Sequence, residues 1–341
     1  MPQDNVVHKL PTLHDACLAQ RRIRPMVWET PLRECRDLAN RSGAASVHLK
    51  LECLQHTGAF KVRGAANKIL GLTDEERRRG VATFSTGNHG KAVAFVAERS
   101  GIPAVVCLSE HVAPYRAAMI HALGAELAIK GRSQDEAEAN YRRLVAARGL
   151  VPVVPFDDPA IIAGQGTIAL EILKALPETD TLIVQLSGGG LLAGIAMVAK
   201  SINPDIEVVG ISLEESPAML KSLEAGTPVQ VEERDTVADS LLGGIGVENH
   251  YTLPLVKGFV DRHLLIAEDP IKDAMFYLFD KHRLIAEGAA AVGVGVLLHR
   301  LIDVSGRRVV AVLSGSSVDS EAYIRILHER FSTPPLPSDG G

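Results

Sequence analysis

The sequence predicts an α/β protein of two lobes, each built on an open parallel sheet. Short apolar runs rich in β-branched residues alternate with longer helical patterns through most of the chain, as in a parallel sheet with helices on both faces. Several of these runs end in a glycine-containing turn that leads directly into a helix. The length of 341 residues exceeds the usual size of one domain, so we expect two.

The order of these segments predicts the domain boundaries. We expect a large domain of residues 1–72 and 155–330, with a small domain of residues 73–154 between its two parts. The end of the chain, residues 331–341, is rich in Pro, Ser and Gly, and we expect it to be disordered.

In the first half of the chain, apolar runs bounded by polar or glycine residues predict the strands. These runs are residues 47–51, 81–85, 104–108, 126–130 and 150–154. The segments between them predict helices that end near Gly71 and Gly80, where glycine commonly terminates a helix. Further helices are expected over residues 91–99 and from near Pro114 and Gln134.

The second half repeats the same alternation. Strands are expected at residues 181–186, 207–212 and 308–313. Helices are expected over residues 159–176, 271–281 and 289–301, and a further one directly after Gly190.

Composition and charge favour a small-molecule partner. The formal net charge of −5 and the lack of a long Lys/Arg run predict no binding of nucleic acid or of an anionic membrane. The four cysteines are scattered and the histidines lack metal-ligand spacing, so we expect reduced thiols and no metal site. Without a secretory pattern or a long apolar stretch at the start, the expected location is the cytoplasm.

The segment from Thr57 to Ala65 contains a candidate covalent lysine, Lys61. A lysine that forms a Schiff base needs a lowered pKa, which burial or a nearby cation such as Arg63 would provide, and Phe60 would pack beside a flat cofactor. The alternative is a helix N-terminus with Lys61 and Arg63 as ordinary solvated charges. These nine residues alone leave the two interpretations about level.

A second candidate site is the turn Ser187-Gly188-Gly189-Gly190 between an expected strand and helix. Backbone N–H groups in such a turn, with the helix dipole, bind phosphate, and side chains there would obstruct it. A tight connection without a ligand explains the glycines equally well. The turn matches neither a P-loop nor a dinucleotide fingerprint.

Two further turns follow expected strands at the edge where ligands bind in open α/β sheets. The segment from Ser85 to Gly90 offers hydroxyl and amide groups to a carboxylate, and Asn88 would donate to an aromatic oxygen. Its alternative role is to cap the next helix, which does not exclude binding. Ser314 places a hydroxyl where it would bond a ring nitrogen, although Leu313–Ser317 taken alone is more simply a turn.

Together these segments resemble the serine/threonine dehydratase family of pyridoxal-phosphate enzymes, of fold type II, over about residues 20–325. The resemblance implies that pyridoxal 5′-phosphate lies in the cleft between the two lobes and is bound covalently by Lys61. Implied cofactor-binding residues are Phe60, Lys61, Asn88, Ser187, Gly188, Gly189, Gly190, Leu191 and Ser314. Implied substrate-binding residues are Ser85, Thr86, Gly87, Asn88 and His89, and Thr86 joins Lys61 as a catalytic candidate.

The resemblance also implies an activity: elimination of water from a 3-hydroxy amino acid, giving a 2-oxo acid and ammonia. Serine racemase is similar, but Thr86 stands where that enzyme has its second acid/base serine, which argues against racemisation. A cysteine-synthase-like replacement at Cβ and a non-catalytic phosphate-binding protein remain as alternatives. A homodimer or higher homo-oligomer is expected.

The departures from the family pattern concern the identity of the substrate and the family's metal site. Ser212 stands where the family has an acidic cation ligand, with Glu214 and Glu215 displaced from it, so no metal is predicted. Residues 239–246, from Asp239 to Gly246, resemble the branch associated with hydroxyectoine breakdown, which implies a hydroxylated diamino acid as substrate. Glu287 matches an active-site helix of the family only loosely and is a minor candidate.

Overall fold

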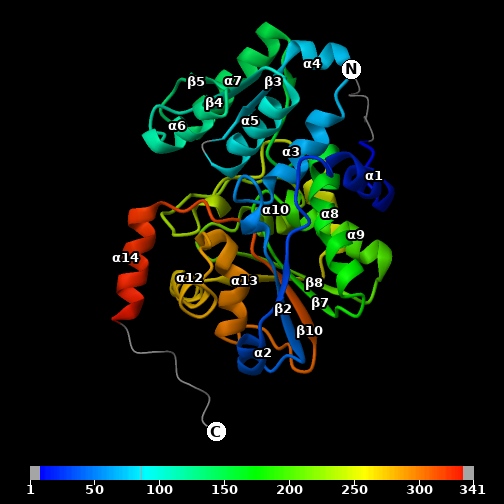
Figure 1. Cartoon of the computed structure of the whole chain (residues 1–341), viewed down its shortest axis with the longest axis vertical. Coiled ribbons are helices and arrows are strands. Elements are labelled where there is room, and N and C mark those ends of the chain that lie inside the picture. The colour runs from blue at the N-terminus through cyan, green and yellow to red at the C-terminus, as the bar shows by residue number, and fades with distance from the viewer. Residues whose placement is uncertain (1–7, 86, 333–341) are drawn as a thin grey trace.

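The computed structural model describes residues 8–85 and 87–332, and its strands form two sheets (Figure 1). Within these residues the larger sheet has six strands, in the order β1 (Leu32–Glu34), β2 (Ser46–Lys50), β10 (Arg308–Val312), β7 (Thr181–Gln185), β8 (Glu207–Leu213) and β9 (Arg262–Ile266). The smaller sheet has four, in the order β5 (Glu126–Ile129), β4 (Ala104–Leu108), β3 (Val81–Phe84) and β6 (Val151–Pro152). All neighbours are parallel except β1 and β2. The predicted α/β class is therefore correct.

Helices cover both faces of the larger sheet because its central strands are apolar on both sides. Along β7, Ile183 packs on one face, whereas Leu182 and Val184 pack on the other. The Ile183 face is covered by α2 (Arg36–Ser42), α12 (Glu268–His282), α13 (Gly288–Leu298) and α14 (Ser320–Phe331). The opposite face is covered by α1 (Leu13–Ile23), α8 (Pro159–Ala175), α9 (Gly190–Ile202), α10 (Ala218–Ala225) and α11 (Thr252–Phe259).

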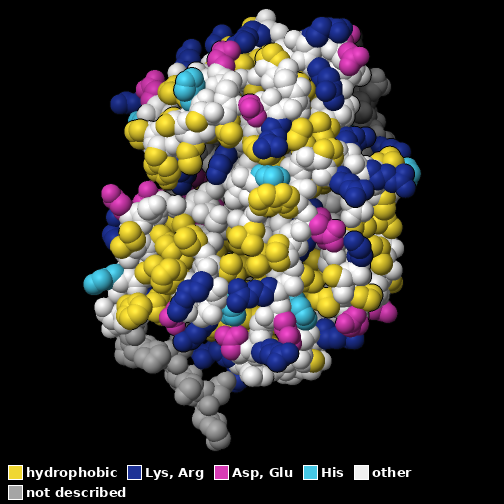
Figure 2. Space-filling model, in the orientation of Figure 1, with side chains coloured by type: hydrophobic (Ala, Val, Ile, Leu, Met, Phe, Trp, Pro, Cys, Tyr) yellow, Lys and Arg dark blue, Asp and Glu magenta, His cyan; other side chains and the backbone are white. Residues whose placement is uncertain are grey.

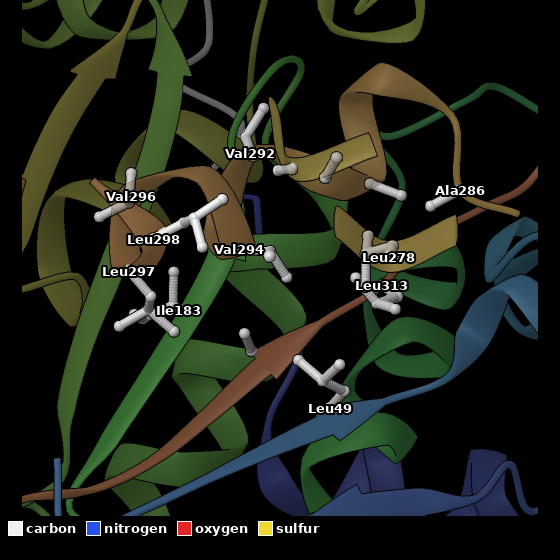
Figure 3. Close-up of a cluster of buried hydrophobic side chains, with 14 of the residues drawn as sticks. Leu49, Ile183, Leu278, Ala286, Val292, Val294, Val296, Leu297, Leu298 and Leu313 are labelled. Atoms are coloured by element: carbon white, nitrogen blue, oxygen red, sulfur yellow. The ribbon is translucent and has the colours of Figure 1, made fainter. Parts of the chain in front are cut away.

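The cluster on the Ile183 face lies between α13 and the strands (Figure 3). Leu49 of β2 and Leu313 after β10 point into it together with Val294 and Leu297 of α13. This packing holds α13 against β2 and the end of β10.

The smaller sheet is also packed on both faces. Its larger apolar cluster involves α3 (Lys61–Leu70), α5 (Asn88–Ser100) and α6 (Pro114–Ala122), and the other involves α7 (Gln134–Arg148). Three short helices complete the described chain: η1 (Glu52–Leu54), α4 (Asp74–Arg79) and η2 (Asp239–Leu241).

The predicted strands and helices are present, with ends that shift by a few residues. The short β1 and the edge strand β9 were not predicted. Phe331 is the last residue of α14, so the expectation of a disordered tail from residue 331 was wrong at that residue; residues 333–341 lie outside the described part. The domain boundaries stay a prediction.

The surface of the protein carries mixed charges. On the face shown in Figure 2, basic and acidic side chains are interspersed. Within residues 8–85 and 87–332, none of the helices combines the length and the apolar character needed to cross a bilayer.

Candidate active site

The segment before Lys61 is attached to the loop that follows β10. Phe60 N–H donates to Ser314 O at 3.0 Å, and Ser316 N–H donates to Gly58 O at 2.8 Å. Gly58 has a φ of 75°, in the left-handed region that favours glycine. These backbone bonds bring together two segments that lie far apart in the sequence, one around Lys61 and one around Ser314.

Lys61 is the first residue of α3, and its side chain is partly buried. Nζ donates to Pro155 O at 2.8 Å and lies 5.2 Å from the centre of the Phe60 ring. Burial lowers the pKa of Lys61 to about 8, against the opposing effect of the Glu287 carboxylate. The lowered pKa and the partly buried side chain favour the Schiff-base interpretation of Lys61 over that of an ordinary solvated charge.

Arg63 does not lower the pKa of Lys61, contrary to our expectation. Its fully buried guanidinium donates to Glu52 Oε2 at 2.7 Å and to Glu171 Oε1 at 2.6 Å. Lys50 Nζ also donates to Glu171. The charge of Arg63 is thus neutralised within a buried ion network beneath α3, and burial alone accounts for the lowered pKa of Lys61.

The glycine turn between β7 and α9 is closely packed. Gly189 has a φ of 89°, and a Cβ on Gly188 would lie 2.5 Å from Phe156 Cγ. The first N–H groups of α9 have no carbonyl partner within the helix. Phe156 follows Pro155, the acceptor of the Lys61 amine, so the turn and Lys61 both contact one short segment. A glycine turn at a helix N-terminus beside a partly buried amine fits an aldehyde cofactor that carries a phosphate.

The loop from Ser85 to Gly90 begins α5 at the end of β3. A Cβ on Gly90 would collide with Ser85 O, so the close turn requires glycine there. Thr86 lies outside the described residues. The Asn88 amide, predicted to face a cofactor oxygen, donates from Nδ2 to Glu287 Oε1 at 2.9 Å and Oε2 at 3.0 Å. Among the described residues, buried Asn88 Oδ1 has no hydrogen-bond partner.

His89 is buried close to Lys61 and is neutral. Nε2 lies 3.0 Å from Val153 O, and because a carbonyl only accepts, Nε2 carries the proton. Burial, with the charge of Lys61, lowers the pKa of His89 to about 3. Its buried Nδ1, which carries the lone pair, has no hydrogen-bond partner in the described part of the chain.

Glu287 is central to the site, although sequence reasoning gave it a minor place. It precedes α13, accepts from the Asn88 amide, and its Oε2 accepts from Ser317 N–H at 3.0 Å. Burial raises the pKa of Glu287 to about 7 despite these hydrogen bonds. The ion pair between Arg116 and Asp239, at 3.0 Å, also acts on the Glu287 charge and was missed. A loose motif match was the only signal for Glu287.

The remaining candidates are Ser314 and the residues at the expected cation position around Ser212. Ser314 is buried directly after β10, beside the Lys61 segment. Ser212 is buried within β8, whereas Glu215 pairs with Arg234 at 2.6 Å.

Comparison with known proteins agrees with this geometry. Residues 23–315 match the model of the pyridoxal-phosphate dependent enzyme family. The chain is 42% identical to a putative threonine dehydratase of Sinorhizobium fredii, over 91% of this chain and 93% of the relative. It is 40% identical to an L-threonine ammonia-lyase of Thermotoga maritima, over 93% and 78%. The structure of maize serine racemase superposes with a TM-score of 0.87 at 30% identity, covering 95% of this chain and 98% of that one. The chain therefore belongs to the pyridoxal-phosphate-dependent enzyme family, within the serine/threonine dehydratase group that its motifs resemble.

Proposed function

We propose that this protein is a dehydratase that eliminates water from a 3-hydroxy amino acid and releases a 2-oxo acid and ammonia. The observation that carries the proposal is Lys61, a partly buried lysine with a pKa of about 8 beside a glycine turn suited to phosphate. The similarity of the chain to the threonine dehydratase and ammonia-lyase relatives supports the same activity.

When bound, pyridoxal phosphate supplies an aldehyde for the lysine and an electron-withdrawing ring for the substrate. Lys61 Nζ would bind that aldehyde and, once released from it, take the proton from the substrate Cα. A pKa of about 8 leaves a substantial neutral fraction of the amine near neutral pH, which a general base requires.

The surrounding residues would position the ring and the substrate. The N–H groups of the turn at residues 187–191 would hold the phosphate, Phe60 would lie beside the ring, and Ser314 would bond the ring nitrogen. A neutral hydroxyl there leaves the ring a weaker electron acceptor than a carboxylate partner would, which favours elimination over prolonged carbanion chemistry.

The loop of residues 85–89 would bind the substrate carboxylate. For Asn88 to reach the cofactor oxygen, as predicted, its amide would have to leave Glu287 or donate its second hydrogen. Glu287 would then hold or release a proton next to the ring, because its pKa of about 7 lies near neutrality.

The test is an assay of 2-oxo acid production from a panel of 3-hydroxy amino acids. We expect oxo acid without any added nucleophile, and loss of turnover in Lys61→Ala but not in the exposed control Lys257→Ala. A yellow absorbance band that borohydride removes should be present only when Lys61 is. A colourless protein with added cofactor would favour the phosphate-binding alternative. A requirement for a sulfide donor would favour replacement at Cβ.

The physiological substrate is a finer part of the proposal. The Asp239–Gly246 segment supports a hydroxyectoine-derived diamino acid, and Asp239 pairs with Arg116 at the rim of the site. A higher kcat/KM for that substrate than for threonine and serine would support it; the reverse order would restrict the assignment to the simpler amino acids.

Racemisation is the second candidate, because the chain resembles maize serine racemase in fold and sequence. Racemisation needs an acid/base group on the face of the substrate opposite Lys61, and the serine that has this role in serine racemase corresponds to Thr86 in this sequence. Chiral analysis of recovered L-serine should show no D-serine; accumulation of D-serine at a rate near that of oxo acid would make racemisation the main activity.

We also propose the division into domains of residues 1–72 with 155–330 and 73–154. The separation of the strands into two sheets, with β3 to β6 all in the smaller one, supports it. The cytoplasmic location and a homo-oligomeric state remain predictions of the sequence.

A further inference from the structure

Four side chains with metal-binding chemistry meet far from Lys61, between α2 and α12. Cys35 precedes α2 and Asp37 lies in its first turn, while Tyr277 and His282 lie in the last two turns of α12. We call these four residues the Cys35 cluster. In Figure 1, α2 lies at the end of the molecule opposite β3 and α4 of the smaller sheet.

The potential ligand atoms of the cluster are mutually close. Cys35 Sγ lies 3.1 Å from His282 Nε2 and 3.5 Å from Asp37 Oδ1, and His282 Nε2 lies 3.6 Å from Asp37 Oδ2. The Tyr277 hydroxyl lies 3.1 Å from His282 Nε2 and 3.5 Å from Cys35 Sγ, and donates a short hydrogen bond to Asp37.

These separations match the edges of a tetrahedral zinc site. Zinc binds thiolate sulfur at about 2.3 Å and imidazole nitrogen or carboxylate oxygen at about 2.0–2.2 Å, so tetrahedral angles place the ligand atoms about 3.4–3.6 Å apart. Cys35 Sγ and His282 Nε2 are 3.1 Å apart, and they face different oxygens of Asp37, at 3.5 Å and 3.6 Å. One ligand atom from each of the three side chains lies within 4.8 Å of the others, so small movements would place them around an ion.

The charge and burial of the cluster also suit a divalent cation. A Cys35 thiolate and the Asp37 carboxylate together balance the charge of Zn²⁺, and Cys35 gives up its thiol proton to solvent on binding. Cys35 is 1% exposed, whereas the Asp37 side chain is 50% exposed, so one ligand is fixed in the protein and another opens to water. We propose that Cys35, Asp37 and His282 bind Zn²⁺, with the Tyr277 hydroxyl or a water at the fourth position.

The spacing along the chain explains why sequence reasoning predicted no metal. Cys35 and His282 are 247 residues apart, and the fold brings the residue before α2 to the end of α12. A bound ion would therefore join the early and late parts of the chain and stabilise the folded state through binding. This site is independent of the cofactor and of the proposed elimination.

The experiment uses the full-length, tag-free holoenzyme and titrates it with Co²⁺, which reports sulfur ligation through a thiolate-to-cobalt charge-transfer band. We expect one Co²⁺ per chain with this band and the visible bands of a tetrahedral ion, displaced by Zn²⁺. Cys35→Ser should lose the charge-transfer band, and His282→Gln should lose the visible bands of the tetrahedral ion. Cys17→Ser, at an exposed cysteine, should keep both.

Asp37→Asn tests the exposed ligand without disturbing the buried ones. It should keep the sulfur band and weaken Zn²⁺ binding by at least about tenfold, measured by competition with a chromophoric chelator. Zn²⁺ should also raise the midpoint of thermal unfolding in the parent protein and in Cys17→Ser, but not in Cys35→Ser. A parent protein without the sulfur band, a band that persists in Cys35→Ser, or an unchanged affinity in Asp37→Asn would overturn the proposed site.

Discussion

Asn88 donates its side-chain amide to both carboxylate oxygens of Glu287, at 2.9 and 3.0 Å. Asn88 begins α5 beside the smaller sheet, and Glu287 precedes α13 on the larger one, so this contact connects the two sheets at the site. The amide favours the charged carboxylate, yet burial has the larger effect and raises the pKa of Glu287 to about 7. Both protonation states of Glu287 are therefore accessible near neutral pH.

The raised pKa of Glu287 predicts a pH-dependent stability. Between the ordinary value of 4.5 and about 7, folded Glu287 holds a proton that the unfolded chain has lost, so its stabilising effect disappears as the pH rises through about 7. Glu287→Gln removes this dependence. Urea unfolding of cofactor-free protein should show Glu287→Gln gaining about 2 kcal/mol over the parent between about pH 5 and about pH 8.

The control for this measurement is Glu224→Gln, an exposed glutamate on α10. Its stability difference from the parent should be nearly constant over the same pH range. A constant difference for Glu287→Gln as well would show that Glu287 has an ordinary pKa in the folded protein.

Lys61 should be unusually reactive in the cofactor-free protein. Its pKa falls from 10.5 to about 8, so near pH 8 about half of the amine is neutral, compared with well under a hundredth of an ordinary lysine. Reductive methylation followed by peptide mass spectrometry should modify Lys61 first, with a rate that levels off above about pH 8. Saturating cofactor should protect Lys61 from methylation, and the methylation of the exposed Lys257 should not change. Equal methylation of the two lysines without cofactor would contradict the lowered pKa of Lys61.

The main elements and the position of Lys61 could be predicted because local sequence determines them. Apolar runs such as Thr181–Gln185 are buried on both faces, and Gly58 and Gly90 mark turns that need glycine. The strand β1 was missed because it is three residues long and partly exposed at a sheet edge, so it has no apolar period to detect.

The electrostatics of the site could not be predicted from local sequence. Arg63, two residues after Lys61, is directed to Glu52 and Glu171, and the latter is 108 residues away. Glu287 reaches Asn88 across 199 residues. Such partners follow from packing between elements, which residue spacing in one chain does not reveal.

The buried network around Arg63 predicts a large structural effect. Arg63→Met leaves the carboxylates of Glu52 and Glu171 buried with only Lys50 to compensate them, and removing one partner of a buried pair typically costs about 3–5 kcal/mol. Urea unfolding should show this loss in the free energy of unfolding. Arg142→Met, which breaks the exposed pair with Glu138 within α7, should change it by less than about 0.5 kcal/mol. Similar losses in the two variants would mean that the network does not stabilise the fold.

Gly188 offers a test of the proposed phosphate turn that does not depend on turnover. A Cβ at this position would lie 2.5 Å from Phe156 Cγ, and the nearest atoms are all in the Phe156 ring, so Gly188→Ala must displace the ring or the turn. Either movement changes the direction of N–H groups that would hold the phosphate, and we expect the Kd for pyridoxal phosphate, measured by fluorescence titration, to rise about tenfold or more.

Gly258→Ala in α11 is the matched control, because its Cβ would meet nothing within 4 Å and alanine favours a helix. Because the cofactor also binds through Lys61, measuring both glycine variants in the Lys61→Ala background isolates the phosphate contribution. A Kd that Gly188→Ala leaves unchanged in that background would place the phosphate away from this turn.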